Sequence, residues 1–263
     1  MDILNTKSLE SNSKIKINFA GGDLTSDAGL LLIKEFINKL GFVKLLKSEF
    51  KTNDNASFRY HKDAENLLQM IYQIIMAYFQ DDCADELTTE PVFTAILEKN
   101  TLASQPTLSR FFNRMDESTL NQFHELMTKF REIVYTVKTP ELMLLDLDST
   151  LLNTYGHQEG EDFNFHYQSH GYHPLVCYDG ITGDLLKIQL RDGTDYSSTG
   201  VVEFLQPLLM EFQNNYPDIP LLLRGDSGFT KPELYEQCEV NGVSYVIRLK
   251  ENKLLRKLAD HID

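Results

Sequence analysis

Two spacings of apolar residues divide this chain. Up to about residue 140 they recur every three or four positions, the period of an amphipathic helix, whereas beyond it they form short dense runs separated by turn residues. The first spacing predicts helices over residues 25–40, 63–80, 91–99, 104–114 and 118–135. Before them, alternating Ile15, Ile17 and Phe19 predict a short strand that Gly21-Gly22 ends. Gly41 is expected to end the first helix, and 137–140 to link two domains.

The second spacing predicts a β-sheet. Strands are expected over residues 142–148, 173–178, 185–190, 219–226 and 244–250, with helices over 198–212 and 232–240. A polar and aromatic loop, 155–172, contains His157, His166 and His170. A strand, a hairpin and then alternating helices and strands describe a mixed sheet with a parallel portion. We therefore predict an α+β protein with α/β character: a helical domain over 1–140 and a mixed sheet with flanking helices over 141–263.

Two of these strands end in acids. Leu142–Leu145 run into Asp146 and Asp148, and Ile219–Leu223 run through Arg224 into Asp226. Side chains alternate along a strand, so Asp146 and Asp148 point to the same face. Two carboxylates together at the end of a buried strand repel each other unless a cation or a proton joins them. A capping or turn carboxylate is the plainer interpretation, but the second acid-ended strand favours a shared site.

The charge is unevenly distributed. The formal net charge is −14. Residues 1–140 contain 16 Lys and Arg against 19 Asp and Glu, and residues 141–263 contain 9 against 20. An acidic surface argues against a nucleic-acid partner, yet hard divalent cations select oxygen ligands, so an acid-rich half also suits a metal.

Scattered cysteines and the lack of a long apolar run indicate the compartment. Cys83, Cys177 and Cys238 form no CxxC pair and are expected to be buried thiols in a reducing environment. The polar N-terminus lacks an apolar leader segment, and no run of about 18 apolar residues is present. We expect a soluble, cytoplasmic protein with no membrane contact.

The segment 104–114 is the candidate nucleic-acid reader. A short helix, a turn and a helix with a polar first turn are the arrangement of a helix-turn-helix, whose second helix presents base-contacting side chains. The side chains expected to face DNA are Gln105, Thr107, Ser109, Arg110 and Arg114, whereas Leu108 and Phe111 point inward. An ordinary surface helix capped by Ser104 explains the same pattern equally well.

Two enzyme families share the motif Asp146-Leu147-Asp148-Ser149-Thr150. It resembles the opening motif of haloacid-dehalogenase-type phosphatases, with Asp146 as nucleophile, Asp148 as general acid and Gly225-Asp226 as metal motif. That resemblance is incomplete. The second acid expected four residues after Asp226 is replaced by Thr230, and no clear lysine motif precedes Gly225.

A larger resemblance covers nearly the whole chain. Residues 142–250 resemble the catalytic core of an insertion-sequence DDE transposase with a ribonuclease-H-like fold. The segments that resemble it are Leu145–Thr150, Gly171–Leu175, Leu190–Thr194, Leu223–Phe229 and Tyr245–Lys250, with Leu24–Leu30 and Leu102–Phe111 resembling the N-terminal domain of the same group.

The resemblance implies a mechanism. First and fourth strands are parallel neighbours in this fold, so Asp148 and Asp226 would meet and hold divalent ions, Mg²⁺ or Mn²⁺, with Asp146 as the second choice for the first acid. It implies DNA strand cleavage and transfer at terminal inverted repeats, on element ends and target DNA. Copies of the protein would assemble on DNA, at the bacterial nucleoid. Arg224, Arg248 and Lys250 would contact phosphate, although salt links within an acidic half explain them equally well.

One departure from the family pattern affects activity. The third acid of the family, a Glu on a helix beyond the fifth strand, has no match; Glu251 follows that strand too soon. We therefore expect a C-terminally truncated product that binds metal weakly and does not transpose. A non-catalytic DNA-binding remnant of a transposase is the remaining alternative.

Overall fold

The structure is a computed structural model that describes residues 6–18, 25–250 and 252–259. The Phe19 end of the first predicted strand, Gly21-Gly22, Leu24 and Glu251 lie outside the described residues. The chain divides into two compact units, Met1–Val137 and Lys138–Asp263.

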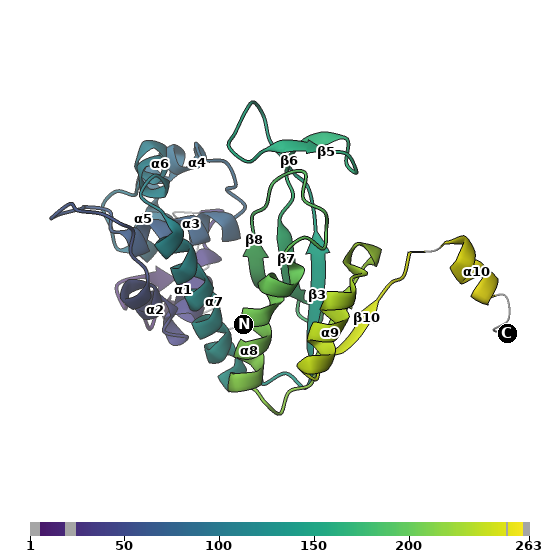
Figure 1. The fold of residues 1–263 in the computed structure, drawn as a ribbon. Coiled ribbons are helices and arrows are strands. Elements are labelled where there is room, and N and C mark those ends of the chain that lie inside the picture. Colours follow the sequence, from purple (N-terminus) through teal and green to yellow (C-terminus); the bar gives the residue numbers. More distant parts are fainter. Residues whose placement is uncertain (1–5, 19–24, 251, 260–263) are drawn as a thin grey trace. The chain divides into compact units, whose positions relative to one another are not determined.

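The first unit is helical. Its helices are α1 (Leu30–Lys39), α2 (Phe42–Glu49), α3 (Asp63–Ile75), α4 (Cys83–Glu86), α5 (Pro91–Leu97), α6 (Gln105–Phe112) and α7 (Glu117–Val137), with a short 3₁₀ turn Leu87–Thr89 (Figure 1). Two short antiparallel strands, β1 (Lys7–Ser8) and β2 (Lys16–Ile17), precede them. The core is built around fully buried large side chains, among them Tyr72, Phe93 and Phe111. Burying such aromatic groups is the main stabilising term of a unit this size.

Three helix predictions need correction. The predicted helix 25–40 begins only at Leu30. Gly41 adopts the left-handed conformation (φ 70°) and leads into α2, a helix that the sequence analysis did not predict. The predicted helix 63–80 ends at Ile75, because the chain turns at Ala77 with φ 65°. Finally, α7 extends to Val137, so the helix takes up the first residue of the predicted linker.

The second unit is a five-stranded mixed sheet in the order β10-β9-β3-β7-β8. The strands are β3 (Met143–Ser149), β7 (Leu175–Asp179), β8 (Leu185–Gln189), β9 (Leu221–Gly225) and β10 (Ser244–Ile247). β3, β9 and β10 are parallel, whereas β7 is antiparallel to both β3 and β8. First and fourth strands are thus parallel neighbours, as in the ribonuclease-H-like fold, and the predicted fold class is confirmed.

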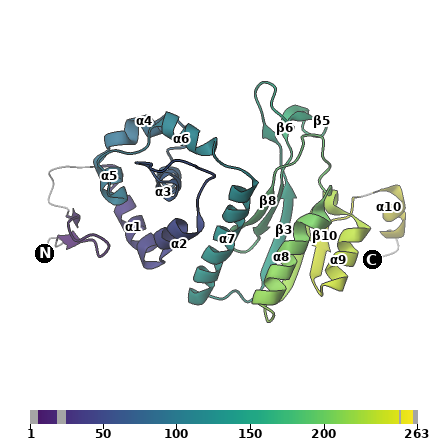
Figure 2. The same cartoon turned by 60° about the vertical axis from the view of Figure 1, so that its left-hand side comes forward.

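Helices cover the apolar face of this sheet. Met143, Leu145 and Leu147 are buried, whereas Asp146 is half-buried and Asp148 exposed, as alternation along a strand requires. The helices α8 (Val201–Asn215) and α9 (Pro232–Val240) lie side by side (Figure 2). Their buried residues, such as Phe204 and Leu234, are apolar. The acid-bearing face is therefore the opposite one. A further short helix, α10, spans Lys253–Ala259.

The segment predicted as a loop, 155–172, contains strands. β5 (Asp162–Asn164) and β6 (Ser169–Tyr172) form an antiparallel hairpin, and β4 (Leu152–Asn153) pairs with β6 on its other side. This small sheet lies at the end of the larger sheet where β3 finishes (Figure 1). Gly171 crosses β4 so closely that a Cβ would lie 2.2 Å from the carbonyl oxygen of Leu152. Within the described parts of the chain, no helix is long and apolar enough to cross a lipid bilayer.

Candidate functional site

Asp148 and Asp226 are brought together by the pairing of β3 with β9. The parallel register aligns Leu147 with Gly225, and each acid comes one residue after its member of that pair. Parallel strands present their carboxyl ends at the same edge of a sheet, so the two acids leave it at the same level. Both line one cavity of about 430 Å³.

Each carboxylate is held by a backbone N–H close to it in the chain. The N–H of Ser149 donates to Oδ1 of Asp148 at 2.7 Å, and the N–H of Gly228 donates to Oδ1 of Asp226 at 2.8 Å. No hydrogen-bond partner of either Oδ2 is found within the described residues. Two anchored carboxylates with one uncommitted oxygen each are suitable ligands for a hard divalent cation. No group of three or more His, Cys, Asp or Glu side chains arranged for a metal occurs in the part of the chain that the structure describes.

Tyr167 lies within electrostatic range of both acids. Burial raises the pKa of its phenol, and the negative charges of Asp148 and Asp226 raise it further. Its hydroxyl donates a hydrogen bond of 3.3 Å to the carbonyl of Ser149. The charges of both carboxylates thus act on the same phenol.

The hairpin turn that presents Tyr167 is held by a buried amide. Asn164 donates to the carbonyl of Gly193 at 2.7 Å and accepts from the N–H groups of His166 and Tyr167. His166 and Tyr167 both line the cavity, together with the buried His173. The ring of His173 packs edge-on against that of Tyr167, and its Nδ1 lies 2.7 Å from the carbonyl oxygen of Asp195.

Sequence reasoning missed Tyr167, His173, Asn164 and Arg191 as parts of this site. Arg191 is 8% exposed and donates to the carbonyls of His173, Tyr196, Ser197 and Thr199. Burial lowers the pKa of its guanidinium. Gly171–Leu175 and Leu190–Thr194 are segments of the family resemblance. The sequence therefore indicated that His173 and Arg191 matter, but it did not show their roles.

Asp146 has a different environment from Asp148. It faces Arg224 across the strand pair, and the guanidinium forms two hydrogen bonds with its carboxylate, Nε to Oδ1 at 2.9 Å and Nη2 to Oδ2. This pairing raises the pKa of Arg224. Neither residue lines the cavity of Asp148 and Asp226. The geometry does not favour a nucleophilic Asp146, because both of its oxygens are engaged by a cation.

The three predicted phosphate contacts of this unit are in different places. Lys250 lines the acid cavity. Arg224 is paired with Asp146, and Arg248 is an exposed residue just beyond β10 whose carbonyl accepts from the hydroxyl of Thr230 at 3.1 Å. Lys250 is therefore the cation of this set that the structure brings to the two acids.

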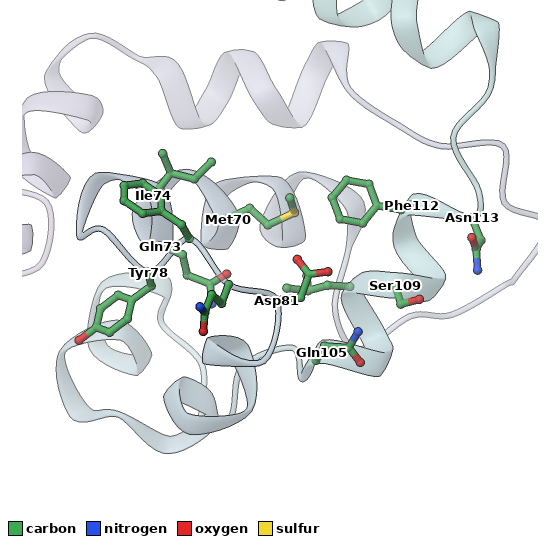
Figure 3. A pocket seen from close by; sticks show the side chains of 12 residues that line it. Met70, Gln73, Ile74, Tyr78, Asp81, Gln105, Ser109, Phe112 and Asn113 are labelled. Atoms are coloured by element: carbon green, nitrogen blue, oxygen red, sulfur yellow. The ribbon is translucent and has the colours of Figure 1, made fainter. Parts of the chain in front are cut away.

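The predicted DNA-contacting side chains of the first unit lie on two flanks of α6. Gln105 and Ser109 line a groove together with Met70 and Ile74 of α3 (Figure 3). Successive helical residues are about 100° apart, so Thr107, Arg110 and Arg114 fall on the other flank. These three line a second, smaller pocket.

The arginines of that second flank differ in their partners. Arg114 forms an ion pair of 2.8 Å with Asp63 and also contacts the hydroxyl of Thr52. Arg110 donates to the hydroxyl of Thr107 at 3.2 Å and has no carboxylate partner among the residues described. Arg110 is thus the predicted arginine that is available to a phosphate or a base.

A family model decides the relationship to known proteins. The model for "Transposase DDE domain group 1" matches residues 7–263. The chain belongs to the DDE transposase family. No curated protein sequence gives a significant match.

Solved structures with some likeness are transposases and an integrase. A piggyBac transposase synaptic complex with hairpin DNA is 16% identical, with 84% of this chain and 51% of that chain covered and a TM-score of 0.43. The catalytic core domain of BIV integrase is 15% identical, covering 45% and 62%, with a TM-score of 0.28. A Mos1 mariner paired-end complex with Mn is 12% identical, covering 92% and 81%, with a TM-score of 0.29. The chain spans between half and two thirds of the first two of these structures.

Proposed function

We propose that this DDE transposase family member acts in DNA transposition, with Asp148 and Asp226 as the ligands of the divalent cation that supports DNA strand cleavage and transfer at element ends. The observation that carries the proposal is the parallel pairing of Leu147 with Gly225, which delivers both acids to one cavity in a member of this family. Asp146, paired with Arg224, serves the sheet rather than the cation.

The residues of the cavity have separate tasks in this proposal. Asp148 and Asp226 each present their uncommitted oxygen to Mg²⁺ or Mn²⁺, which when bound polarises phosphoryl oxygens and lowers the pKa of water. Lys250 attracts the phosphate of the DNA backbone to a cavity that is otherwise acidic. The Asn164-anchored turn holds Tyr167 beside the acids and restricts the space left for water and DNA.

The first unit binds duplex DNA through the outward face of α6 in the same proposal. Gln105 and Ser109 on one flank, and Thr107 and Arg110 on the other, are the side chains that reach bases or phosphates. Assembly of two or more copies on element ends, in the bacterial cytoplasm at the nucleoid, completes it.

The cation part is tested by Mn²⁺ binding, measured by electron paramagnetic resonance. Asp148→Asn and Asp226→Asn should each abolish specific binding because each removes an anionic ligand. Asp218→Asn is the matched control, since Asp218 is an exposed acid in the turn before β9, at the other end of that strand. Equal Mn²⁺ binding by all three variants would refute the assigned ligands.

The DNA part is tested by titrating labelled element-end duplex at several salt concentrations. Phosphate contacts release counterions, so affinity should fall steeply as salt rises. Arg110→Ala should weaken binding by about 1–3 kcal/mol if the side chain contacts a base, and should reduce the salt slope by about one if it contacts a phosphate. Binding that is insensitive to both salt and Arg110→Ala would contradict this role of α6.

That two carboxylates do not suffice for cleavage stays a prediction. Its test is strand nicking by the 263-residue chain with Mg²⁺ or Mn²⁺. We expect no cleavage, because two carboxylates are a small ligand set for reluctantly dehydrated Mg²⁺. Cleavage that depends on Asp148 and Asp226 would show that another residue completes the site.

A further inference from the structure

A pocket of about 210 Å³ lies on the second flank of α6. One polar side chain in its wall has no hydrogen-bond partner among the described residues. Thr107 and Arg110 of α6 form one side, and the segment containing Phe58 and Tyr60 forms another. Asn66 of α3 is the buried member of its wall, at 1% exposure. This volume suits one nucleobase better than a base pair.

Both ends of the Asn66 amide lack a partner. Neither Nδ2 nor Oδ1 makes a hydrogen bond to any residue in the described ranges. Gln69, one helical turn later and 2% exposed, shows the usual arrangement: its amide donates to the carbonyl of Ala103 at 2.8 Å and accepts from its N–H at 2.9 Å. Buried amides without partners are destabilising and rare in native proteins. A ligand that satisfies Asn66 is the explanation that also accounts for its place in a pocket wall.

Nδ2 and Oδ1 of Asn66, the two atoms without partners, determine which ligand chemistry fits. A phosphate only accepts hydrogen bonds, so it would satisfy Nδ2 and leave Oδ1 without a donor. The edge of a nucleobase has a donor next to an acceptor, as in adenine N6 and N7, and an Asn amide satisfies both at once. The amide therefore fits a base better than an anion.

The rest of the wall suits the other parts of a nucleotide. Phe58 is 78% exposed and Tyr60 49% exposed, and Nζ of Lys99 lies over the ring of Tyr60 at 4.5 Å from its centroid, so Phe58 is the more available of the two rings to stack on a base. Arg59 is paired with Asp54, and Arg114 with Asp63. Arg110 has no carboxylate partner within the described part of the chain and is free to bind the phosphate of the same nucleotide.

We propose that this pocket binds one unpaired nucleobase of DNA, with its edge on Asn66, its face on Phe58 or Tyr60, and its phosphate on Arg110. The inference rests on the proposed DNA binding by α6. Asn66 is too deeply buried to reach the edge of a base within a duplex, so the bound base must lie outside the stack. Adenine is the base chosen to test the pocket, because its N6 donor and N7 acceptor match the amide.

The test uses the full chain and two fluorescein-labelled duplexes that differ at one position. One carries a single bulged adenine and the other an abasic bulge, and binding is followed by fluorescence anisotropy. The native protein should bind the adenine bulge roughly tenfold to a hundredfold more tightly, the range expected for a bidentate base contact. Asn66→Leu should make the two affinities equal. Phe58→Ala should reduce the preference, and Phe79→Ala, which removes an equally exposed ring at 74% exposure outside this pocket, should not.

The outcomes separate this inference from the DNA-binding proposal. Tight but equal binding of both duplexes would overturn the base pocket and leave duplex binding by α6 standing. If neither duplex binds, α6 is not the reader, and a single-stranded adenine oligonucleotide compared with its abasic counterpart then decides the pocket on its own. Failure of the native chain to distinguish those two strands would overturn it.

A urea titration tests whether Asn66 has only a structural role. Asn66→Leu removes a buried amide without partners and should leave the unfolding midpoint unchanged or raised, whereas Gln69→Leu should lower it because two backbone groups of Ala103 lose their partners. An equal loss of stability in both variants would show that Asn66 serves the fold, contrary to the proposal.

Discussion

Arg224 holds both carboxylate oxygens of Asp146 across the same pair of strands that delivers Asp148 and Asp226 to one cavity. The ion pair of Arg224 with Asp146 gives different environments to Asp146 and Asp148, two acids that are only two residues apart. One is neutralised within the sheet, and the other retains a free oxygen.

This separation predicts different effects of the two Asp→Asn changes. Asp146→Asn should leave Mn²⁺ affinity within about twofold of the native value, since an exposed ion pair contributes about 0–1 kcal/mol to stability and no ligand is lost. Asp148→Asn should abolish specific Mn²⁺ binding. Titration of Mn²⁺ by electron paramagnetic resonance distinguishes the two, and stronger loss in Asp146→Asn would reverse the assignment.

The titration of Tyr167 reports on the same acids. Its pKa is raised by burial and by the charges of Asp148 and Asp226, because a phenolate there is repelled by both. Removing one negative charge, as in Asp148→Asn, should therefore lower this pKa, and a bound divalent cation should lower it as well. The chain has 12 tyrosines. The measurement is thus the difference in ultraviolet titration between each protein and its Tyr167→Phe counterpart, and an unchanged difference curve in Asp148→Asn would place Tyr167 away from the acids.

Arg191 is predicted to be a major contributor to the stability of the second unit. Its buried guanidinium serves the carbonyls of four residues, and each buried group left without a partner costs about 1–3 kcal/mol. Arg191→Leu should therefore lower the free energy of unfolding by several kcal/mol, measured by urea denaturation. Arg248→Leu is the control at an exposed position and should stay within about 0.5 kcal/mol. A small effect of Arg191→Leu would mean that water replaces the guanidinium.

Cys238 predicts a pH dependence. Burial raises the pKa of its thiol to about 11, whereas the thiol titrates near 9 when exposed in the unfolded chain. Because the folded-state pKa is the higher one, this group stabilises the fold fully below pH 9, and the contribution is lost as the pH rises toward 11. Below pH 9 the urea midpoints of the native protein and Cys238→Ala should therefore change in parallel with pH, and between pH 9 and 11 the midpoint of the native protein should fall more steeply. At pH 8 Cys238 should resist alkylation until the protein unfolds, whereas the half-buried Cys83 should react first.

Local periodicity was enough to predict most of the architecture. The helical first half, the five main strands and the two helices that cover the sheet follow from apolar spacing, because each element must bury one face. The failures are at positions where the backbone reverses. Gly41 ends the first helix as predicted, but its left-handed conformation also leads directly into the unpredicted α2, and Ala77 ends α3 with a φ of 65° that alanine seldom adopts. The β5–β6 hairpin was not predicted, because its two strands lack the apolar alternation that marks a strand in the sequence. Backbone pairing between the two strands forms it.

For the site, the sequence alone determined that two strands end in acids and that Asp146 and Asp148 share a face, because alternation is a property of the strand itself. It did not determine which acid is free. That choice depends on the register of β3 with β9, which places Arg224 opposite Asp146 and leaves Asp148 level with Asp226. Likewise, helical spacing identified the polar side chains of α6, but only packing against α3 and the preceding segment left Arg110 available, engaged Arg114 and buried Asn66 without a partner. Contacts between segments far apart in the chain are made by the tertiary fold, and no local pattern encodes them.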